Sequence, residues 1–430
     1  MIRGFLRNFA VIMDLKIFPP EQLTEAPVNL PLSKSESNRQ LIIAALTPGA
    51  ALPERVADCD DTDALRGALD ASAGRINIGA AGTAMRFLTA YFACKPGADV
   101  TLDGSERMRR RPIAPLVDAL RSLGADIDYA GEEGFPPLRI RGRMLEGGNV
   151  ELDASVSSQF VSALLMVGPT MQHGLHLRLR GQVISTPYIL MTLSLMEDAG
   201  VKAIYDADAG TIDVPYGVYC PGLPEVEADW SAASYWFEIA AISAEPVALL
   251  GLRRKSLQGD SAVRRLFEVT GLQSGFEADG SLRLQLTPDA GSQLAVDFSD
   301  NPDLAQTMAV ACCLLALPFR FEGLQSLRIK ETDRLAALQM ELSKLGFITD
   351  VEEPGVLLWR GARFDPGEEI EPICTYDDHR MAMAFAPAAL FFPGLQICNA
   401  EVVSKSYPQF WNHLRAAGFT LQEVIEDEDA

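Results

Sequence analysis

Basic and hydroxyl side chains gather at the start of a predicted helix near the beginning of the chain. In the segment LSKSESNRQLIIAAL, Lys34, Ser35 and Arg39 stand just before an apolar helical stretch. The first turn of a helix has free backbone N–H groups and the positive end of the helix dipole, to which the two cations add formal charge. The segment therefore predicts a phosphate site, and a serine-capped, solvated helix start is the alternative.

Two further segments of the first half combine close backbone approach with positive charge. In GAAGTAMRF, small residues up to Gly82 allow a ligand to lie against the backbone, and Thr83 is expected to cap the helix that follows. In RRRPIAP, Pro112 seats Arg111 at a helix start, where a planar guanidinium suits a carboxylate or a phosphate. A tight turn and a solvated charge run are the respective alternatives.

Hydroxyl groups precede two more predicted helices. The segment SVSSQFVSALLM places Ser157, Ser158 and Gln159 at a helix start, which is more hydroxyl groups than one cap requires. The segment ISTPYILM adds Ser185 and Tyr188, for which simple turn chemistry is the alternative. Together they are typical of a site for an anion or a polyol.

The second half supplies carboxylates beside cations. Asp303 precedes the apolar stretch LAQTMAVACCLLAL, where it is either a helix cap or a base held in a dry cleft. The segment RIKETDRL brings Lys330, Glu331 and Arg334 within five positions, which provides a possible acid, a possible base and two cations. A local network of salt bridges is the alternative there.

One histidine stands in a similar setting. In TYDDHRMAM, His379 follows two aspartates, so we expect its pKa to be raised and its ring to act as an acid or a donor. Metal ligation is disfavoured, because adjacent residues seldom converge on one ion and Arg380 opposes it. The late segment VVSKSYPQF adds Lys405 before another predicted helix.

The composition limits the possible partners. The 430 residues include 37 Lys and Arg against 58 Asp and Glu, a net charge of −21 that repels nucleic acid and anionic membranes. Seven scattered cysteines predict free thiols in a reducing compartment. The first residues make a poor signal peptide, and no stretch reaches the roughly 20 apolar residues that span a bilayer. We therefore expect a cytoplasmic protein.

A repeat organises the helices that carry these residues. Amphipathic stretches followed by a glycine and a strand-like run recur at near-constant steps of 76, 71, 75 and 72 residues, at Gly124, Gly200, Gly271, Gly346 and Gly418. A sixth copy ends near Gly74, only 50 residues before the next, so that unit has lost about twenty residues. Each unit has room for two helices and about four strands. The pattern predicts an α+β fold in which three copies build each of two similar domains, with a ligand cleft between them.

The motifs LSKSESNR, AGTAMRF, RRRPI, SVSSQF, IKETDRL and TYDDHRMAM, in this order, closely resemble the EPSP synthase family of enolpyruvyl transferases. The resemblance runs from about residue 30 to residue 415. It implies two domains, each of three βαβαββ units with inward-facing helices (an inside-out α/β barrel). The first domain would comprise residues 33–227 and the second residues 1–32 plus 228–430, with the active site in the cleft.

The resemblance also implies an activity. Enzymes of this family transfer the enolpyruvyl group of phosphoenolpyruvate to the 5-hydroxyl of shikimate 3-phosphate and need no metal or organic cofactor. The residues expected to bind shikimate 3-phosphate are Lys34, Ser35, Arg39, Ser157, Ser158, Gln159, Ser185, Tyr188, Asp303, Ser326 and Lys330. Those expected to bind phosphoenolpyruvate are Lys34, Gly82, Arg111, Gln159, Arg334, Arg380 and Lys405.

The expected chemistry needs an acid and a base together. We assign Asp303 as the base for the 5-hydroxyl and Glu331 as the proton shuttle at carbon, with Lys34 assisting at the departing phosphate. The roles of these three groups can be exchanged, and sequence does not decide between them. His379 is expected to donate a hydrogen bond near the same site. We further expect an open form without substrates and a closed ternary complex.

Three positions depart from the family pattern, and two rival functions remain. Ala80 and Ser326 stand where asparagine is usual, and Phe87 replaces a common proline. The rivals are a UDP-N-acetylglucosamine enolpyruvyl transferase and a catalytically silent protein that binds phosphorylated metabolites. The first rival is expected to carry a loop cysteine near RMRRRPI, and this chain has no cysteine between Cys94 and Cys220. We expect a monomer.

Overall fold

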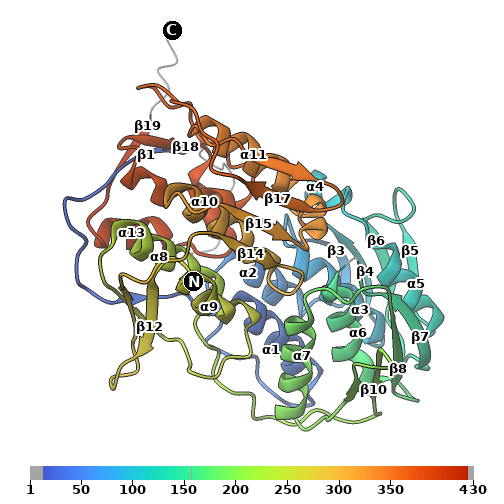
Figure 1. The fold of residues 1–430 in the computed structure, drawn as a ribbon. Coiled ribbons are helices and arrows are strands. Elements are labelled where there is room, and N and C mark those ends of the chain that lie inside the picture. The colour runs from blue at the N-terminus through green and yellow to red at the C-terminus, as the bar shows by residue number, and fades with distance from the viewer. Residues whose placement is uncertain (1–12, 156, 425–430) are drawn as a thin grey trace.

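A computed structural model describes residues 13–155 and 157–424. In Figure 1 the light-blue to green segments gather on one side and the yellow to red segments on the other, and the dark-blue start of the described chain lies with the red segments. The expectations about the first residues of the chain lie outside the described part. Among the described residues, no helix is long and apolar enough to cross a membrane.

The first half contains two four-stranded sheets with helices between their strands. The first sheet has the strand order β3-β4-β6-β5, built from β3 (Ala73–Asn77), β4 (Asp99–Asp103), β5 (Asp126–Tyr129) and β6 (Leu138–Arg141). The second has the order β7-β8-β10-β9, built from β7 (Gly148–Asp153), β8 (Leu175–Arg180), β9 (Ile204–Asp206) and β10 (Thr211–Val214). Their helices are α3 (Gly82–Cys94), α4 (Glu106–Arg109), α5 (Ala114–Ser122), α6 (Ser158–Val167) and α7 (Thr186–Asp198).

The second half repeats this design. One sheet has the order β12-β13-β11-β2, built from β2 (Val28–Asn29), β11 (Val247–Leu250), β12 (Leu272–Phe276) and β13 (Leu282–Leu286). The next has the order β14-β15-β17-β16, built from β14 (Leu294–Asp297), β15 (Phe319–Glu322), β16 (Asp350–Glu352) and β17 (Val356–Trp359). Their helices are α8 (Trp230–Ser243), α9 (Val263–Glu268), α10 (Ala305–Leu314) and α11 (Arg334–Lys344).

The last sheet closes the chain on itself. It has the order β18-β1-β19, built from β1 (Asp14–Phe18), β18 (Leu395–Ile397) and β19 (Thr420–Val424), with helices α12 (His379–Phe385) and α13 (Phe410–Ala416). Strand β1 is antiparallel to both neighbours, so a strand from the start of the chain completes a unit formed by its end.

The four four-stranded sheets share one pairing pattern. In each sheet, the two strands that come first along the chain are parallel, and the remaining pairs are antiparallel. Every glycine of the predicted repeat has a positive φ, between 85° and 106°, a conformation that glycine adopts without steric cost. The repeat is therefore confirmed as a structural unit. Its short first copy contains α1 (Lys34–Leu46) and α2 (Asp60–Ala68) and no sheet of its own among the described residues.

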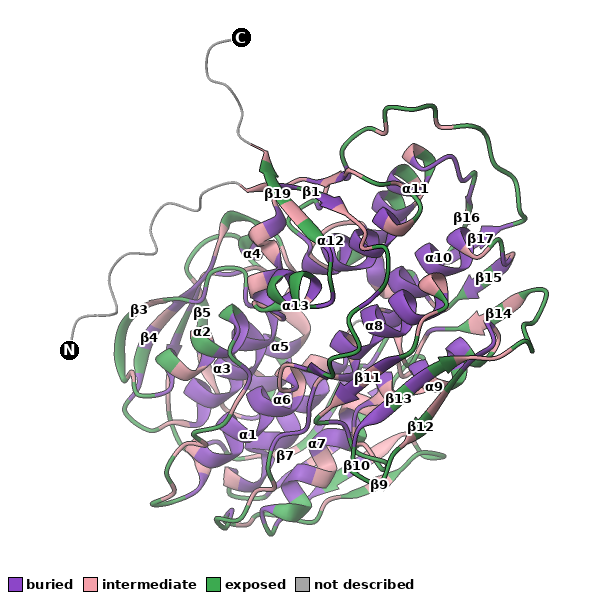
Figure 2. Ribbon diagram, turned by 90° about the vertical axis from the view of Figure 1, so that its left-hand side faces the viewer, coloured by how far each residue is buried: buried purple, intermediate pink, exposed green. Residues whose placement is uncertain are grey.

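The buried apolar side chains form two separate cores. One core draws on residues 41–219 and the other on residues 15–30 and 228–419. Helices α3 and α10 are buried along their whole length, as Figure 2 shows for α10 in purple, while strand faces are exposed. A helix that is apolar all round has to lie inside, so the sequence places these helices at the centre of each half.

The chain crosses between the halves at two adjacent places. Leu32 and Ala228 form an isolated bridge, and the Ser33 backbone N–H donates to the Glu227 carbonyl at 2.7 Å. The proposed boundaries at residues 32/33 and 227/228 stay a prediction, which the division of the core supports.

Candidate active site

One pocket brings the two halves together. Its lining comes from residues 34–188 of the first half and residues 302–380 of the second. Seven cationic side chains line it against three carboxylates, namely Lys34, Arg39, Arg86, Arg111, Lys330, Arg334 and Arg380 against Asp61, Asp303 and Glu331. A chain with a net charge of −21 therefore concentrates positive charge at this place, which suits a ligand with several negative charges.

Lys34 lies at the first position of α1, where Ser33 caps the helix by accepting from the Glu36 backbone N–H. Its ammonium group pairs with Asp61 at 3.4 Å. Burial lowers the pKa of Lys34, but the attractions of Asp61, Cys59 and Glu331 together raise it by more, so the net shift is upward. Lys34 is therefore protonated at neutral pH and can give a proton or hold an anion.

Arg39 is a buried cation with neutral partners. Its guanidinium donates to the Thr192 hydroxyl at 2.7 Å, to the Ser162 hydroxyl at 3.0 Å and to the Ser35 carbonyl at 2.8 Å. The rings of Phe87 and Tyr188 lie 5.3 and 5.7 Å from it. Burial lowers the pKa of Arg39 to about 10, so it keeps its charge at neutral pH.

The predicted hydroxyl groups lie on the same wall. Ser157 caps α6 by accepting from the Gln159 backbone N–H, and the Gln159 side chain donates to the Thr83 hydroxyl at 3.2 Å. The prediction that Thr83 caps α3 is wrong, because the capping position belongs to Ala81, which has no side-chain oxygen. Ser185 has a left-handed backbone (φ 55°) before α7, and its N–H donates to the Ser299 carbonyl across the cleft.

Of the four arginines between residues 107 and 111, only Arg111 lines the pocket. Arg109 and Arg110 pair with Asp103 and Glu106 instead. The Arg111 guanidinium lies against the start of α3, where a Cβ on Gly82 would be 2.7 Å from its nitrogen. Gly82 is therefore needed to make room for this cation.

Asp303 lies between two arginines of the second half. It accepts from Arg334 at 2.9 Å and from Arg380 at 2.9 Å. Burial alone would raise the pKa of Asp303, but Arg380, Lys330 and Arg334 together hold it well below its usual value. The carboxylate is thus ionised and does not cap a helix, since its short helix has no side-chain cap.

Glu331 is the second carboxylate of this wall. It accepts from Arg334 at 2.9 Å and from Lys405 at 3.0 Å, and Arg111 of the first half lies at 3.7 Å. Burial would raise its pKa, yet Lys405, Arg334 and Arg111 lower it well below its usual value. Lys405 is not part of the pocket lining and reaches the site through Glu331.

His379 differs from expectation. Burial lowers its pKa well below the usual value, and Lys34 and Arg380 add to this shift, so the predicted raised pKa is wrong. Asp378 does not compensate, because it binds Arg334 at 2.6 Å and lies 3.8 Å from the ring. Both ring nitrogens are buried without a hydrogen-bond partner among the described residues. A neutral ring that lines the pocket in this state can still donate one hydrogen bond to a ligand.

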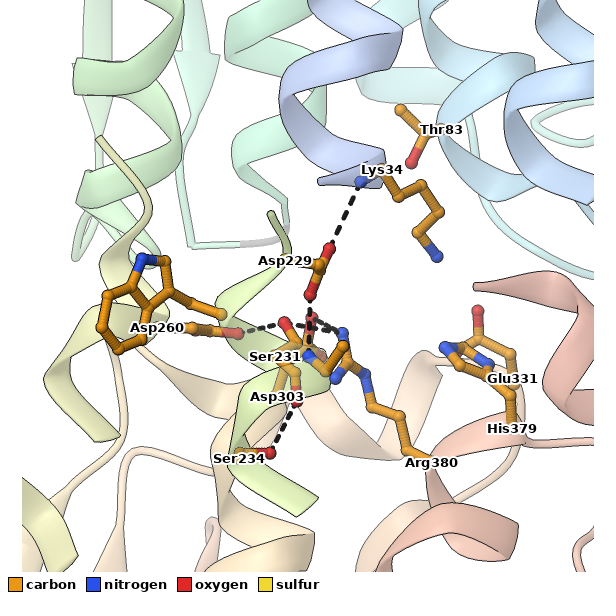
Figure 3. A network of polar contacts seen from close by, with 12 residues as sticks. Lys34, Thr83, Asp229, Ser231, Ser234, Asp260, Asp303, Glu331, His379 and Arg380 are labelled. Atoms are coloured by element: carbon orange, nitrogen blue, oxygen red, sulfur yellow. Dashed lines mark hydrogen bonds and ion pairs between the residues drawn. The ribbon is translucent and has the colours of Figure 1, made fainter. Parts of the chain in front are cut away.

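Contacts across the cleft show that the two halves are closed on the pocket. Away from the crossover, Arg107 donates to the Lys330 carbonyl at 3.2 Å and Arg111 lies 3.7 Å from Glu331. Beside the crossover, the Lys34 backbone N–H donates to Asp229 at 3.2 Å, as Figure 3 shows. The open form stays a prediction.

Comparison with known proteins agrees with this geometry. Residues 65–414 match the family model described as EPSP synthase (3-phosphoshikimate 1-carboxyvinyltransferase). A 3-phosphoshikimate 1-carboxyvinyltransferase from Bacteroides fragilis is 50% identical over 405 residues, covering 94% of this chain and 97% of the relative. The chain belongs to the EPSP synthase family. A relative of the same name from Shewanella halifaxensis is 36% identical, covering 92% of this chain and 98% of its own.

Solved structures of the family share the fold. EPSP synthase from Acinetobacter baumannii superposes with a TM-score of 0.75 at 20% identity, covering 96% of this chain and 100% of that one. The two-domain α+β architecture implied by the motifs is thereby confirmed.

Motif-based prediction missed two charged groups of this EPSP synthase-type pocket. Asp61, which partners Lys34, comes from the acidic first turn of α2, and the run DCDDTD was its signal. Arg86 is buried, and its Nε has no hydrogen-bond partner among the described residues. It stands in the motif AGTAMR, so its position was visible although its role was not assigned.

The three departures from the family pattern lie at different distances from the pocket. Ser326 lines it, whereas Ala80 is exposed and does not. Phe87 is fully buried in α3 with its ring against Arg39. This chain therefore supports a predicted substrate-binding cation with an aromatic ring.

Proposed function

We propose that this protein transfers the enolpyruvyl group of phosphoenolpyruvate to the 5-hydroxyl of shikimate 3-phosphate and releases phosphate. The observation that carries the proposal is the cation-rich pocket between the two halves, which holds Asp303 between Arg334 and Arg380. Both substrates are anionic, so fixed cations neutralise their charges, and an ionised carboxylate beside them can accept a proton from the attacking hydroxyl.

The proposed binding site for shikimate 3-phosphate lies mainly on the wall of the first half, and Asp303, Ser326 and Lys330 reach it from the second half. Hydroxyl and amide groups there suit a polyol, and Lys34 and Arg39 suit its phosphate and hydroxyls. The residues of this proposed set are Lys34, Ser35, Arg39, Ser157, Ser158, Gln159, Ser185, Tyr188, Asp303, Ser326 and Lys330, all of which line the pocket.

The proposed site for phosphoenolpyruvate lies where cations of both halves converge. Arg111 and Arg334 both approach Glu331 from opposite walls, so an anion entering between them competes with that carboxylate. The residues of this proposed set are Lys34, Gly82, Arg111, Gln159, Arg334, Arg380 and Lys405.

The proton transfers of the proposed reaction follow from these positions. The 5-oxygen bonds to C2 of phosphoenolpyruvate while its proton passes to Asp303, and C3 receives a proton to become a methyl group. In the second step the C2–O bond to phosphate breaks, and a proton leaves C3 to restore the double bond. The products are the enolpyruvyl ether and phosphate, with no net change in oxidation state.

Glu331 can serve at C3 only after it takes up a proton. In the described state Lys405, Arg334 and Arg111 keep it ionised, but substrate anions that pair with these cations weaken that effect and raise the pKa of Glu331. Lys34 is already protonated and is the other candidate donor. His379 would donate a hydrogen bond to the substrate between these groups.

The proposal includes a setting for the reaction. We propose that the protein acts as a monomer in the cytoplasm, with domains 33–227 and 1–32 plus 228–430 that close over the substrates. The proposed reaction includes neither a metal nor an organic cofactor, as the resemblance to the family implies.

A phosphate-release assay tests the function against its rivals. Purified protein is mixed with phosphoenolpyruvate and either shikimate 3-phosphate or UDP-N-acetylglucosamine. Release that requires shikimate 3-phosphate supports the proposal, whereas release with the nucleotide sugar, or tight binding without turnover, refutes it. The family model and relatives carry the shikimate description, so the nucleotide-sugar alternative is not favoured.

A further inference from the structure

A third carboxylate lies behind the pocket and is not used by the proposed chemistry. Asp260, in the short helix Gly259–Ala262, is 2% exposed and does not line the pocket. Its Oδ2 accepts from the Ser231 hydroxyl at the start of α8, and its Oδ1 has no hydrogen-bond partner among the described residues. Burying a carboxylate oxygen without a hydrogen-bond partner costs folding free energy, which suggests that this carboxylate has a role besides stability.

Asp260 connects to Asp303 through two intermediate groups. The Ser231 oxygen also accepts from the Arg380 Nη2 at 3.4 Å, and the same nitrogen donates to Asp303 at 2.9 Å. Figure 3 shows Ser231 between Asp260 and the Arg380 guanidinium, with dashed lines along the whole chain. One cation is therefore placed between two carboxylates, of which only Asp303 faces the substrates.

The segment that carries Asp260 is fixed by its neighbours. Gln258 accepts from the Trp230 backbone N–H at 3.0 Å and donates to the Ala228 carbonyl at 2.8 Å, beside the crossover between the halves. A Cβ on Gly259 would lie 2.5 Å from Pro187 of α7, so this segment packs directly against the first half. The closed cleft thus holds Asp260 in place and keeps water from it.

We propose that Asp260 is a positioning residue whose charge, carried through Ser231 and Arg380, sets how strongly the general base takes up the substrate proton. This inference rests on the proposed function. When Asp260 is ionised it shares the positive charge of Arg380, so Asp303 is less stabilised as an anion and is a stronger base. When Asp260 is protonated, Arg380 acts on Asp303 alone and weakens it as a base.

The surroundings of Asp260 place this change within an accessible pH range. Burial and then the charge of Asp303 raise the pKa of Asp260 to about 6, against the opposing effect of Arg380. Asp229 also acts on it, and the buried Tyr188 phenol faces the same cluster. Asp260 is protonated below about pH 6 and ionised above it, so turnover is expected to fall as the pH drops through this value.

The test is the pH dependence of kcat between pH 5 and 9 at saturating substrates. The Asp260→Asn variant keeps the acceptor for Ser231 but is neutral at every pH. We expect kcat at pH 8 to fall roughly tenfold, less than the 10²–10⁴ that loss of a general base costs, and the acid limb near pH 6 to disappear. Asp279→Asn, on an exposed loop, is the matched control and should keep both kcat and the limb.

A second variant moves the limb rather than removing it. In Ser231→Ala the Asp260 carboxylate loses the hydrogen bond that stabilises its ionised form, so the acid limb should shift to higher pH. This variant also decides the matter if Asp260→Asn fails to fold, which thermal melting will show.

The substrates provide the competing explanation, because phosphate monoesters also titrate near pH 6. A limb caused by substrate would persist unchanged in both variants, and that result would overturn the inference, as would a wild-type profile without an acid limb. Absence of wild-type turnover with shikimate 3-phosphate would instead refute the proposed function.

Discussion

The two walls of the pocket carry different chemistry. The wall of the first half presents hydroxyls, an amide and cations, and Asp61 is its one carboxylate among the lining residues. The wall of the second half presents Asp303 and Glu331, each held by arginine, with Asp378 behind them. The same repeating unit has thus produced one surface suited to holding a polyol phosphate and another suited to moving protons.

This difference lies in the helix starts. Helix α6 begins with serines that offer neutral hydrogen bonds. Arg39 of α1 donates to the neutral hydroxyls of Thr192 and Ser162, and these partners leave its charge uncompensated. Helices α11 and α12 begin at aspartates, Asp333 and Asp378, and carry Arg334 and Arg380 at their first turns. A division of labour between binding and proton transfer follows, and four changes can break or sharpen it.

The largest effect is expected for Asp303→Ala. This change removes the proposed base, so kcat should fall by about 10²–10⁴ while the protein still folds. Steady-state phosphate release measures it, with exposed Asp289→Ala as the matched control. A near-normal kcat would refute the role of Asp303.

The opposite wall is tested by Arg39→Lys. Lysine keeps the charge but loses the forked contacts to Thr192, Ser162 and Ser35, so KM for shikimate 3-phosphate should rise about 10- to 100-fold with a smaller effect on kcat. Initial rates at varied substrate concentrations separate the two constants. An effect confined to kcat would remove the distinction between the walls.

A smaller loss is expected for His379→Gln. The wild-type ring is neutral because its pKa is lowered, so it carries no charge change between pH 6 and 9. Glutamine can replace its hydrogen bond, and kcat should fall about tenfold or less with an unchanged pH profile. A change in the acid limb would mean that His379, and not Asp260, titrates there.

The smallest effect concerns the ring that supports Arg39. Phe87→Leu should raise KM for shikimate 3-phosphate by roughly two- to fivefold, the size of a modest cation–π contact. Phe92→Leu is the matched control, since Phe92 is equally buried in α3 and has no contact with Arg39 among those described. Equal effects of the two changes would indicate a packing loss rather than support of the cation.

The repeat could be predicted from sequence because each unit ends a helix at a glycine that needs positive φ. Gly124, Gly200 and Gly346 illustrate this, and the structure gives all of them that conformation. The short interval before Gly124 indicated that one unit had lost about twenty residues, but not that the first unit has no sheet of its own among the described residues. Site residues such as Lys34 and Arg380 could be found because their motifs are specific.

Charge states could not be predicted in the same way. The pKa of His379 was expected to be raised by the two aspartates before it. In the structure Asp378 binds Arg334 and Asp377 is exposed, while the ring is buried near Lys34 and Arg380. Asp260 has no motif of its own and becomes notable only when the fold sets it behind Arg380. Sequence specifies which residues converge, whereas burial and long-range pairs decide their protonation.

Calorimetric titration of shikimate 3-phosphate into Asp303→Asn and Arg39→Lys tests the division between the walls most directly. The account predicts that Asp303→Asn binds the ligand within about threefold of wild type although its turnover is lost, since asparagine can still hydrogen-bond the hydroxyl. It predicts at least about tenfold weaker binding for Arg39→Lys. Loss of binding in Asp303→Asn together with wild-type affinity in Arg39→Lys would contradict it.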